Sequence, residues 1–95
     1  MMVGFVAIHY PHDAHHDEFV FRVKQAAEVM RPTPGCLAAD CWVTPLGEAV
    51  ISIARWESEA AQLASIATAK AAGVDFRYDE REARPREVFV LRRPQ

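Results

Sequence analysis

The sequence predicts an α+β fold in which four antiparallel strands pack against two helices on one face. Four short apolar stretches have the period of two that marks strands, and two longer segments have helical spacing. Proline and glycine separate these segments, which gives the order strand, helix, strand, strand, helix, strand. The 95 residues suffice for one domain, and we expect residues 1–95 to form it.

The first two elements are a strand over 3–10 and a helix that runs to about residue 31. Pro11 ends the strand, and Asp13 or Asp17 begins the helix. The apolar side chains of the helix fall on one stripe and predict its buried face: Phe19, Val23, Ala26, Ala27 and Met30. The segment 32–35, with two prolines and a glycine, is the turn that follows.

Two strands, over 36–44 and 49–56, form a hairpin closed by the loop 45–47. A second helix follows over 58–72, with Ser58 as its N-cap and Gly73 as its C-cap. One side of this helix is expected to pack on the sheet: Ala60, Leu63, Ile66, Ala67 and Lys70. The segment 74–83 has features of both strand and helix, and 87–91 is the last strand. The whole is a ferredoxin-like βαββαβ arrangement.

Both faces of the predicted hairpin carry apolar residues. Alternation assigns one face to Leu37, Ala39, Cys41, Val43, Val50, Ser52, Ala54 and Trp56, and the other to Cys36, Ala38, Asp40, Trp42, Ala49, Ile51, Ile53 and Arg55. Two helices cover only one face, and large exposed apolar patches are rare. We therefore expect a homodimer joined sheet to sheet, in which the last strand helps to complete a barrel.

Composition excludes several classes of protein. A net charge of −2 gives no support to nucleic-acid binding, and no segment is apolar for long enough to cross a membrane. No signal peptide is recognisable, so we expect a cytoplasmic protein. Cys36 and Cys41 point to opposite faces of a strand, roughly 17 Å apart, which is too far for a disulfide. The charged run 79–82 predicts a solvated surface.

The chain resembles the antibiotic biosynthesis monooxygenase domain family of the dimeric α/β-barrel superfamily. Four segments carry the resemblance: His9-Tyr10-Pro11, Thr33-Pro34-Gly35-Cys36, Arg55-Trp56-Glu57-Ser58-Glu59-Ala60 and Pro85-Arg86-Glu87-Val88-Phe89. The resemblance implies paired four-stranded sheets with a hydrophobic pocket between each sheet and its helices. It also implies cofactor-independent oxygenation of polycyclic phenols or degradation of haem. Haem-degrading relatives use an Asn on the first strand. This chain contains no Asn, which disfavours haem degradation.

Four residues are candidates for the site, each with an alternative structural role. Trp56, at the end of a strand, is expected to stack on a planar ligand or else to fill the core. His9 is expected to exchange protons near neutral pH. Tyr78 and Arg55 are further candidates for holding the substrate. The small side chains of Ala39, Ser52 and Ala54 leave room for an apolar cavity lined by Trp56, and close packing by the helices is the alternative.

No metal site is expected. His12, His15 and His16 have helical spacing, but Pro11 and Asp13 place His12 before the helix begins. Metal sites also usually draw ligands from several elements. Two functions remain open. The first is a monooxygenase that acts without a cofactor on a small aromatic or polyphenolic substrate. The second is a non-catalytic domain of the same fold that binds a small hydrophobic molecule or only its own copy.

Overall fold

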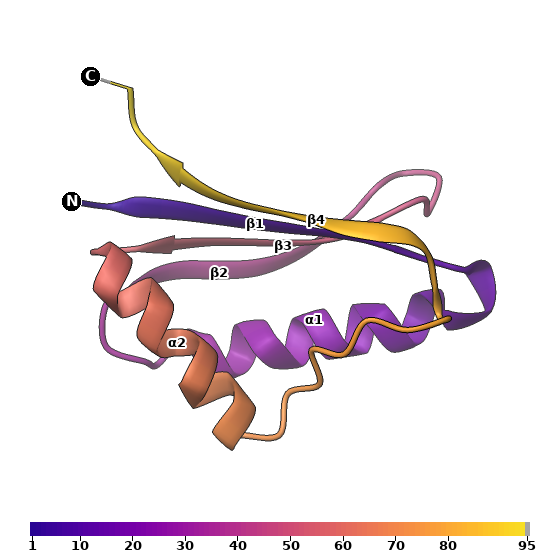
Figure 1. Cartoon of the computed structure of the whole chain (residues 1–95), viewed down its shortest axis with the longest axis horizontal. Helices are drawn as coiled ribbons and strands as arrows, with labels where there is room; N and C mark the ends of the chain where they lie inside the picture. The colour runs from indigo at the N-terminus through magenta and orange to yellow at the C-terminus, as the bar shows by residue number, and fades with distance from the viewer. Residues whose placement is uncertain (95) are drawn as a thin grey trace.

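The computed structural model describes residues 1–94 and has four strands and two α-helices in the predicted order (Figure 1). The strands pair antiparallel in the order β2-β3-β1-β4. The elements are β1 (Val3–Pro11), the 3-10 turn η1 (Asp13–His15), α1 (His16–Met30), β2 (Cys36–Val43), β3 (Val50–Trp56), α2 (Glu59–Ala71) and β4 (Glu82–Arg92). No helix within residues 1–94 is long and apolar enough to span a membrane.

Both helices lie on the same side of the sheet, as the apolar pattern predicts (Figure 1). The buried face of α1 is the predicted stripe: Phe19, Val23, Ala26 and Ala27 are buried, and Met30 packs beside them. Small residues of the sheet, Ala39 and Ala54, meet Ala27 in the core next to Trp56. Close packing therefore holds over β2 and the end of β3.

A bulge at the start of β2 places Cys36 and Leu37 on the faces of the sheet opposite to those predicted. Ala39, Cys41 and Val43 pair with Ala54, Ser52 and Val50 as expected, but the register shifts between Cys36 and Ala38. A β-bulge adds one residue to a strand and reverses the alternation beyond it. Cys36 consequently packs into the helix-side core and Leu37 is exposed, so the predicted assignment of these two residues was wrong. Both cysteines are free.

The buried face of α2 also differs from the prediction. Its buried residues are Gln62, Ser65 and Ala69, whereas Leu63 is 58% exposed. Alanine at many positions leaves this helix with little apolar periodicity, so the sequence pattern does not fix its orientation. The Ser58 hydroxyl accepts a hydrogen bond from the Ala61 N–H and caps the helix, as predicted.

The chain between α2 and β4 is a loop, and β4 begins earlier than the sequence indicates. Residues 74–79 have no regular structure, and the last strand runs over Glu82–Arg92 instead of 87–91. Its pairing with β1 shifts register around Tyr10, and such irregularities hide a strand from a search for strict alternation. The extension turns the side chain of Glu82 inward, where it is fully buried.

Candidate functional site

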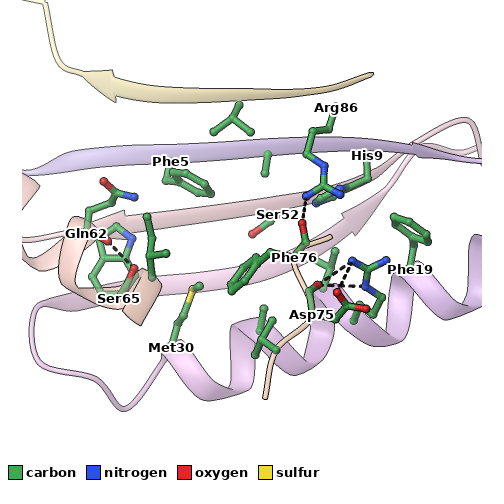
Figure 2. Close-up of a pocket in the computed structure, with 18 residues that line it drawn as sticks. Phe5, His9, Phe19, Met30, Ser52, Gln62, Ser65, Asp75, Phe76 and Arg86 are labelled. Atoms are coloured by element: carbon green, nitrogen blue, oxygen red, sulfur yellow. Dashed lines mark hydrogen bonds and ion pairs between the residues drawn. The ribbon is translucent and has the colours of Figure 1, made fainter. Parts of the chain in front are cut away.

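A cavity of about 130 Å³ lies between the sheet and the helices (Figure 2). A single water needs only about 10–15 Å³ of such space, so the helices do not close over the centre of the sheet. The middle of the cavity is apolar: Phe5, Ala7, Val23, Ala26, Met30, Val74 and Phe76 line it. Ser52 also lines it, in agreement with the prediction that small residues of β3 leave space.

Polar side chains stand at opposite ends of the apolar middle (Figure 2). Gln62 and Ser65 of α2 are at one end, and both are 4% exposed. His9 and Arg86, from β1 and β4, are at the other end. A mostly apolar cavity with a few convergent polar groups is the usual form of a small-molecule site.

His9 is the titratable side chain of the cavity that is best suited to acid–base chemistry. Its side chain is 13% exposed, and Nδ1 lies 3.5 Å from Oε1 of Glu82. Burial, followed by the positive charge of Arg86, lowers the pKa of His9, while the charge of Glu82 opposes this shift. The imidazole is therefore neutral at pH 7 and able to accept a proton.

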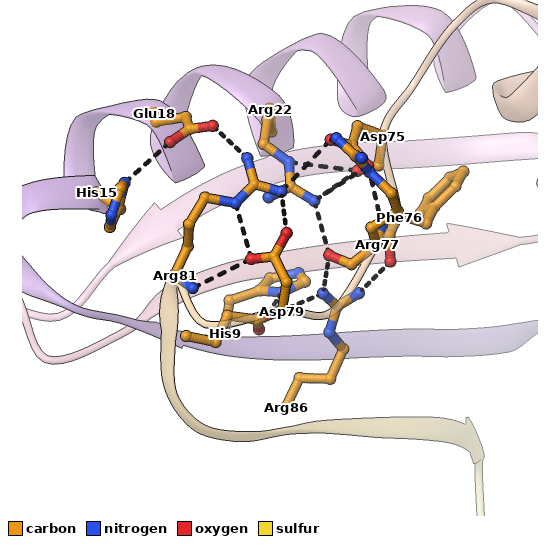
Figure 3. Close-up of polar contacts among 11 residues, drawn as sticks. His9, His15, Glu18, Arg22, Asp75, Phe76, Arg77, Asp79, Arg81 and Arg86 are labelled. Carbon is orange, nitrogen blue, oxygen red and sulfur yellow. Dashed lines mark hydrogen bonds and ion pairs between the residues drawn. The ribbon is translucent and has the colours of Figure 1, made fainter.

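The loop between α2 and β4 lies at the His9 end of the cavity and is held in place by arginine side chains (Figure 3). Arg22 of α1 donates to the Asp75 carbonyl at 2.8 Å, and Arg81 binds Asp79 through Nε at 2.8 Å and also pairs with Glu18. Hydrogen bonds from Arg81 lower the pKa of Asp79 to about 2. These contacts fix Val74, Asp75 and Phe76 against the cavity.

The predicted solvated surface over 79–82 is therefore wrong in part. The Arg81 side chain is only 15% exposed and the Glu82 side chain is fully buried, since α1 supplies ionic partners to the loop and β4 directs Glu82 inward. Arg22, which falls outside the apolar stripe of α1, is 11% exposed and stacks on Phe19 with 4.4 Å between the guanidinium carbon and the ring centre.

The structure brings together two of the four predicted site residues. Trp56 and His9 both line the cavity, and Trp56 is 1% exposed. Arg55 follows the alternation of β3 to the opposite face of the sheet and is exposed. Tyr78 is 53% exposed and does not line this cavity. The guanidinium carbon of Arg86 lies 5.7 Å from the centre of its ring.

The other histidines lie outside the cavity. His15 Nδ1 is 3.2 Å from Glu18 Oε1, and His16 Nδ1 is 3.6 Å from Asp17 Oδ1. Within residues 1–94, no three or more His, Cys, Asp or Glu side chains are grouped as metal ligands would be.

Sequence reasoning missed several polar residues at or beside the cavity, among them Gln62, Glu82 and Arg86. Gln62 lies in a helix whose orientation the pattern does not determine. Glu82 and Arg86 lie four residues apart in a charged stretch, and a spacing of four on a strand does place two side chains on one face. Only the long-range pairing of β4 with β1 reveals that this face is the inner one.

The family follows from comparison with known proteins. The family model described as antibiotic biosynthesis monooxygenase matches residues 2–71, which is most of the chain. The protein therefore belongs to the antibiotic biosynthesis monooxygenase family. No curated protein matches it significantly.

Solved structures confirm the fold. Rv0793 from Mycobacterium tuberculosis is 19% identical with a TM-score of 0.82, and the match covers 100% of this chain and 97% of that one. A conserved protein from Methanosarcina mazei is 16% identical with a TM-score of 0.85, covering 99% and 94%. A variant of SnoaB, a cofactor-independent oxygenase from Streptomyces nogalater, is 19% identical with a TM-score of 0.73, covering 99% and 94%.

Proposed function

We propose that this protein is a cofactor-independent monooxygenase for a small phenol that binds between the sheet and the helices. The observation that carries the proposal is the cavity itself, in which the neutral, buried imidazole of His9 lies at one end of an apolar chamber. Membership of the family supports it, as does the similarity in fold to an oxygenase described as cofactor-independent.

The size of the cavity favours a substrate with one aromatic ring. An engineered cavity of about 150 Å³ in another protein accepts benzene, and the cavity here is of similar volume, about 130 Å³. The side chains of Phe5, Met30 and Phe76 supply apolar surface for the ring. Gln62 at the far end is available to bind a polar substituent.

The chemistry requires His9 to take up one proton and to return it. His9 accepts the phenol proton, and the resulting phenolate donates one electron to molecular oxygen. The phenoxyl radical and superoxide combine at the ring to give a peroxide anion, which regains the proton from His9 as a hydroperoxide. Loss of one water then leaves a quinone, so that one phenol and one O₂ give one quinone and one H₂O. A general base typically contributes about 10²–10⁴-fold to such a rate, and exclusion of water protects the radical pair.

Oxygen uptake with single-ring phenols and quinols tests this function. We expect uptake with the native protein and a loss of about 10²–10⁴-fold in H9Q. His12→Gln is the matched control, because His12 is an exposed histidine outside the cavity and its loss should leave uptake unchanged. Uptake that persists in H9Q would contradict the role of His9. Binding of phenols without uptake would favour the alternative, a non-catalytic binding domain.

We further propose that the protein acts as a homodimer. Within residues 1–94 both helices cover one face of the sheet (Figure 1), and the other face carries large exposed apolar side chains: Trp42, Ile53, Phe89 and Leu91. The register aligns Val6, Ile53 and Phe89 across three neighbouring strands. A second copy offers the same apolar surface.

We also propose a reducing, cytoplasmic location, which the free Cys36 and Cys41 support.

A further inference from the structure

Glu82 is a buried carboxylate that the proposed chemistry does not use directly. Its side chain has no exposed surface, and an unpaired charge in such a place is strongly unfavourable. Two groups stand beside it: Nδ1 of His9 lies 3.5 Å from Oε1, and Nη2 of Arg86 donates a hydrogen bond to Oε2. The carboxylate thus lies between a cation and the imidazole of the cavity.

The rigid surroundings of Arg86 fix this arrangement. Its Nη1 donates to the Phe76 carbonyl and its Nη2 to the Arg77 carbonyl, both at 2.9 Å. Arg22 reaches the same Arg77 carbonyl at 3.3 Å, so two guanidinium groups meet near one oxygen. Glu82 is therefore held from the loop side. Its Oε1 and the Nδ1 of His9 are both buried without a hydrogen-bond partner, and these two unsatisfied atoms lie 3.5 Å apart.

We propose that Glu82 is a positioning residue for His9, holding the Nδ1–H form of the imidazole so that Nε2 is left to accept a proton in the cavity. Arg86 holds the Glu82 side chain in place through its hydrogen bond to Oε2. This pairing resembles the carboxylate-histidine arrangement by which enzymes select one tautomer. The inference deepens the proposed function, but the pairing exists in the free protein and is measurable without substrate.

The charges that face His9 have opposing effects. On β4, Glu82 favours the imidazolium and Arg86 opposes it. On α1, Arg22 also opposes it, although Asp75 lies 3.8 Å from Arg22 and partly compensates its charge. The neighbour on β3 is Val50, which carries no charge, and the ring of Phe19 lies 5.9 Å away. Because Glu82 and Arg86 shift the pKa of His9 in opposite directions, variants of these two residues can be compared with each other.

The test is a pH titration of the His9 imidazole by NMR in three proteins, with H9Q used to assign its signals. In E82Q the carboxylate charge is lost and the shape is kept, so the pKa of His9 should fall below that of the native protein. In R86Q the cation is lost, so the pKa of His9 should rise. A nearby charge changes a dissociation constant by about tenfold or more, and we expect E82Q and R86Q to differ by at least this factor.

Two further measurements separate positioning from a general structural role. The nitrogen shifts of the neutral ring should show the proton on Nδ1 in the native protein. Arg86→Lys, which keeps the positive charge, should leave the pKa of His9 close to the native value. A pKa unaffected by both E82Q and R86Q, or a proton on Nε2 in the native protein, would overturn the inference.

Oxygen uptake distinguishes this inference from the proposed function. If the pKa changes occur and no phenol is oxidised, the pairing stands and the monooxygenase proposal fails. If H9Q abolishes uptake but E82Q leaves both the rate and its pH profile unchanged, the function stands and the positioning role fails. If both hold, E82Q should lower the rate and move the acidic limb of its pH profile in step with the pKa measured by NMR.

Discussion

Trp56 shows how one side chain serves both the core and the site. It packs with Val3 and Ala54 in a buried cluster, and it also lines the cavity. The two roles considered for it from sequence, core filling and ligand stacking, are therefore compatible. Truncation to Ala would remove about 3–5 kcal/mol of stability, so its ligand role is better tested without replacing it.

Fluorescence offers that test. The chain has two tryptophans, and Trp42 is 57% exposed on the other face of the sheet. In a Trp42→Phe variant, Trp56 is the sole indole, and we expect saturable quenching on titration with a single-ring phenol because the ring must pack beside the indole. The phenol should quench poorly in a variant that fills the cavity, such as Ala26→Leu. Linear, non-saturating quenching in W42F would argue against a site at Trp56.

At the scale of elements, the turn between α1 and β2 contacts the junction between β3 and α2. Gly35, in the turn before β2, accepts a backbone hydrogen bond at 2.8 Å from Glu57, which lies just before α2. Its φ is +87°, and a Cβ atom there would come within 2.5 Å of the Ala61 Cβ. This glycine thus permits the approach of α2 to the start of β2.

Gly35→Ala should therefore be clearly destabilising. The left-handed backbone costs a non-glycine residue about 1–2 kcal/mol, and overpacking adds about 1–3 kcal/mol. Gly73→Ala is the matched control, because Gly73 has a φ of +85° but no atom within 4 Å of the added methyl group. Urea unfolding of both variants should show a greater loss of stability in G35A; equal losses would mean that the contact with Ala61 adjusts freely.

The elements also show how far the sequence leads. The period of two and the stripe of α1 predict the βαββαβ order, the hairpin of the second and third strands and a cavity lined by Trp56, because these depend on local alternation. Two features depend instead on tertiary pairing: the bulge that turns Cys36 inward and the orientation of the alanine-rich α2. The polar side chains of Gln62 and Arg86 enter the cavity through such pairings, so sequence reasoning missed them.

For the whole molecule, the proposed dimer rests on the exposed face of the sheet. In the register of the sheet, Ile51 lies between Trp42 and Ile8, and Ile53 lies between Asp40 and Val6. The face is thus apolar at its centre with few charges, as expected of an interface between identical subunits. Because β4 contributes Phe89 and Leu91 to this face, the last strand belongs to both the cavity and the proposed interface.

Ile53→Asp should convert the dimer to a monomer, because it places a carboxylate in the middle of the apolar face, where it would be desolvated without a partner. Light scattering at micromolar concentration should give twice the 10.7 kDa of one chain for the native protein and 10.7 kDa for I53D. Phe21→Asp is the control, since Phe21 is 67% exposed on α1, and it should remain dimeric. A native protein that is already monomeric would refute the proposed dimer, and the apolar face would then need a different partner.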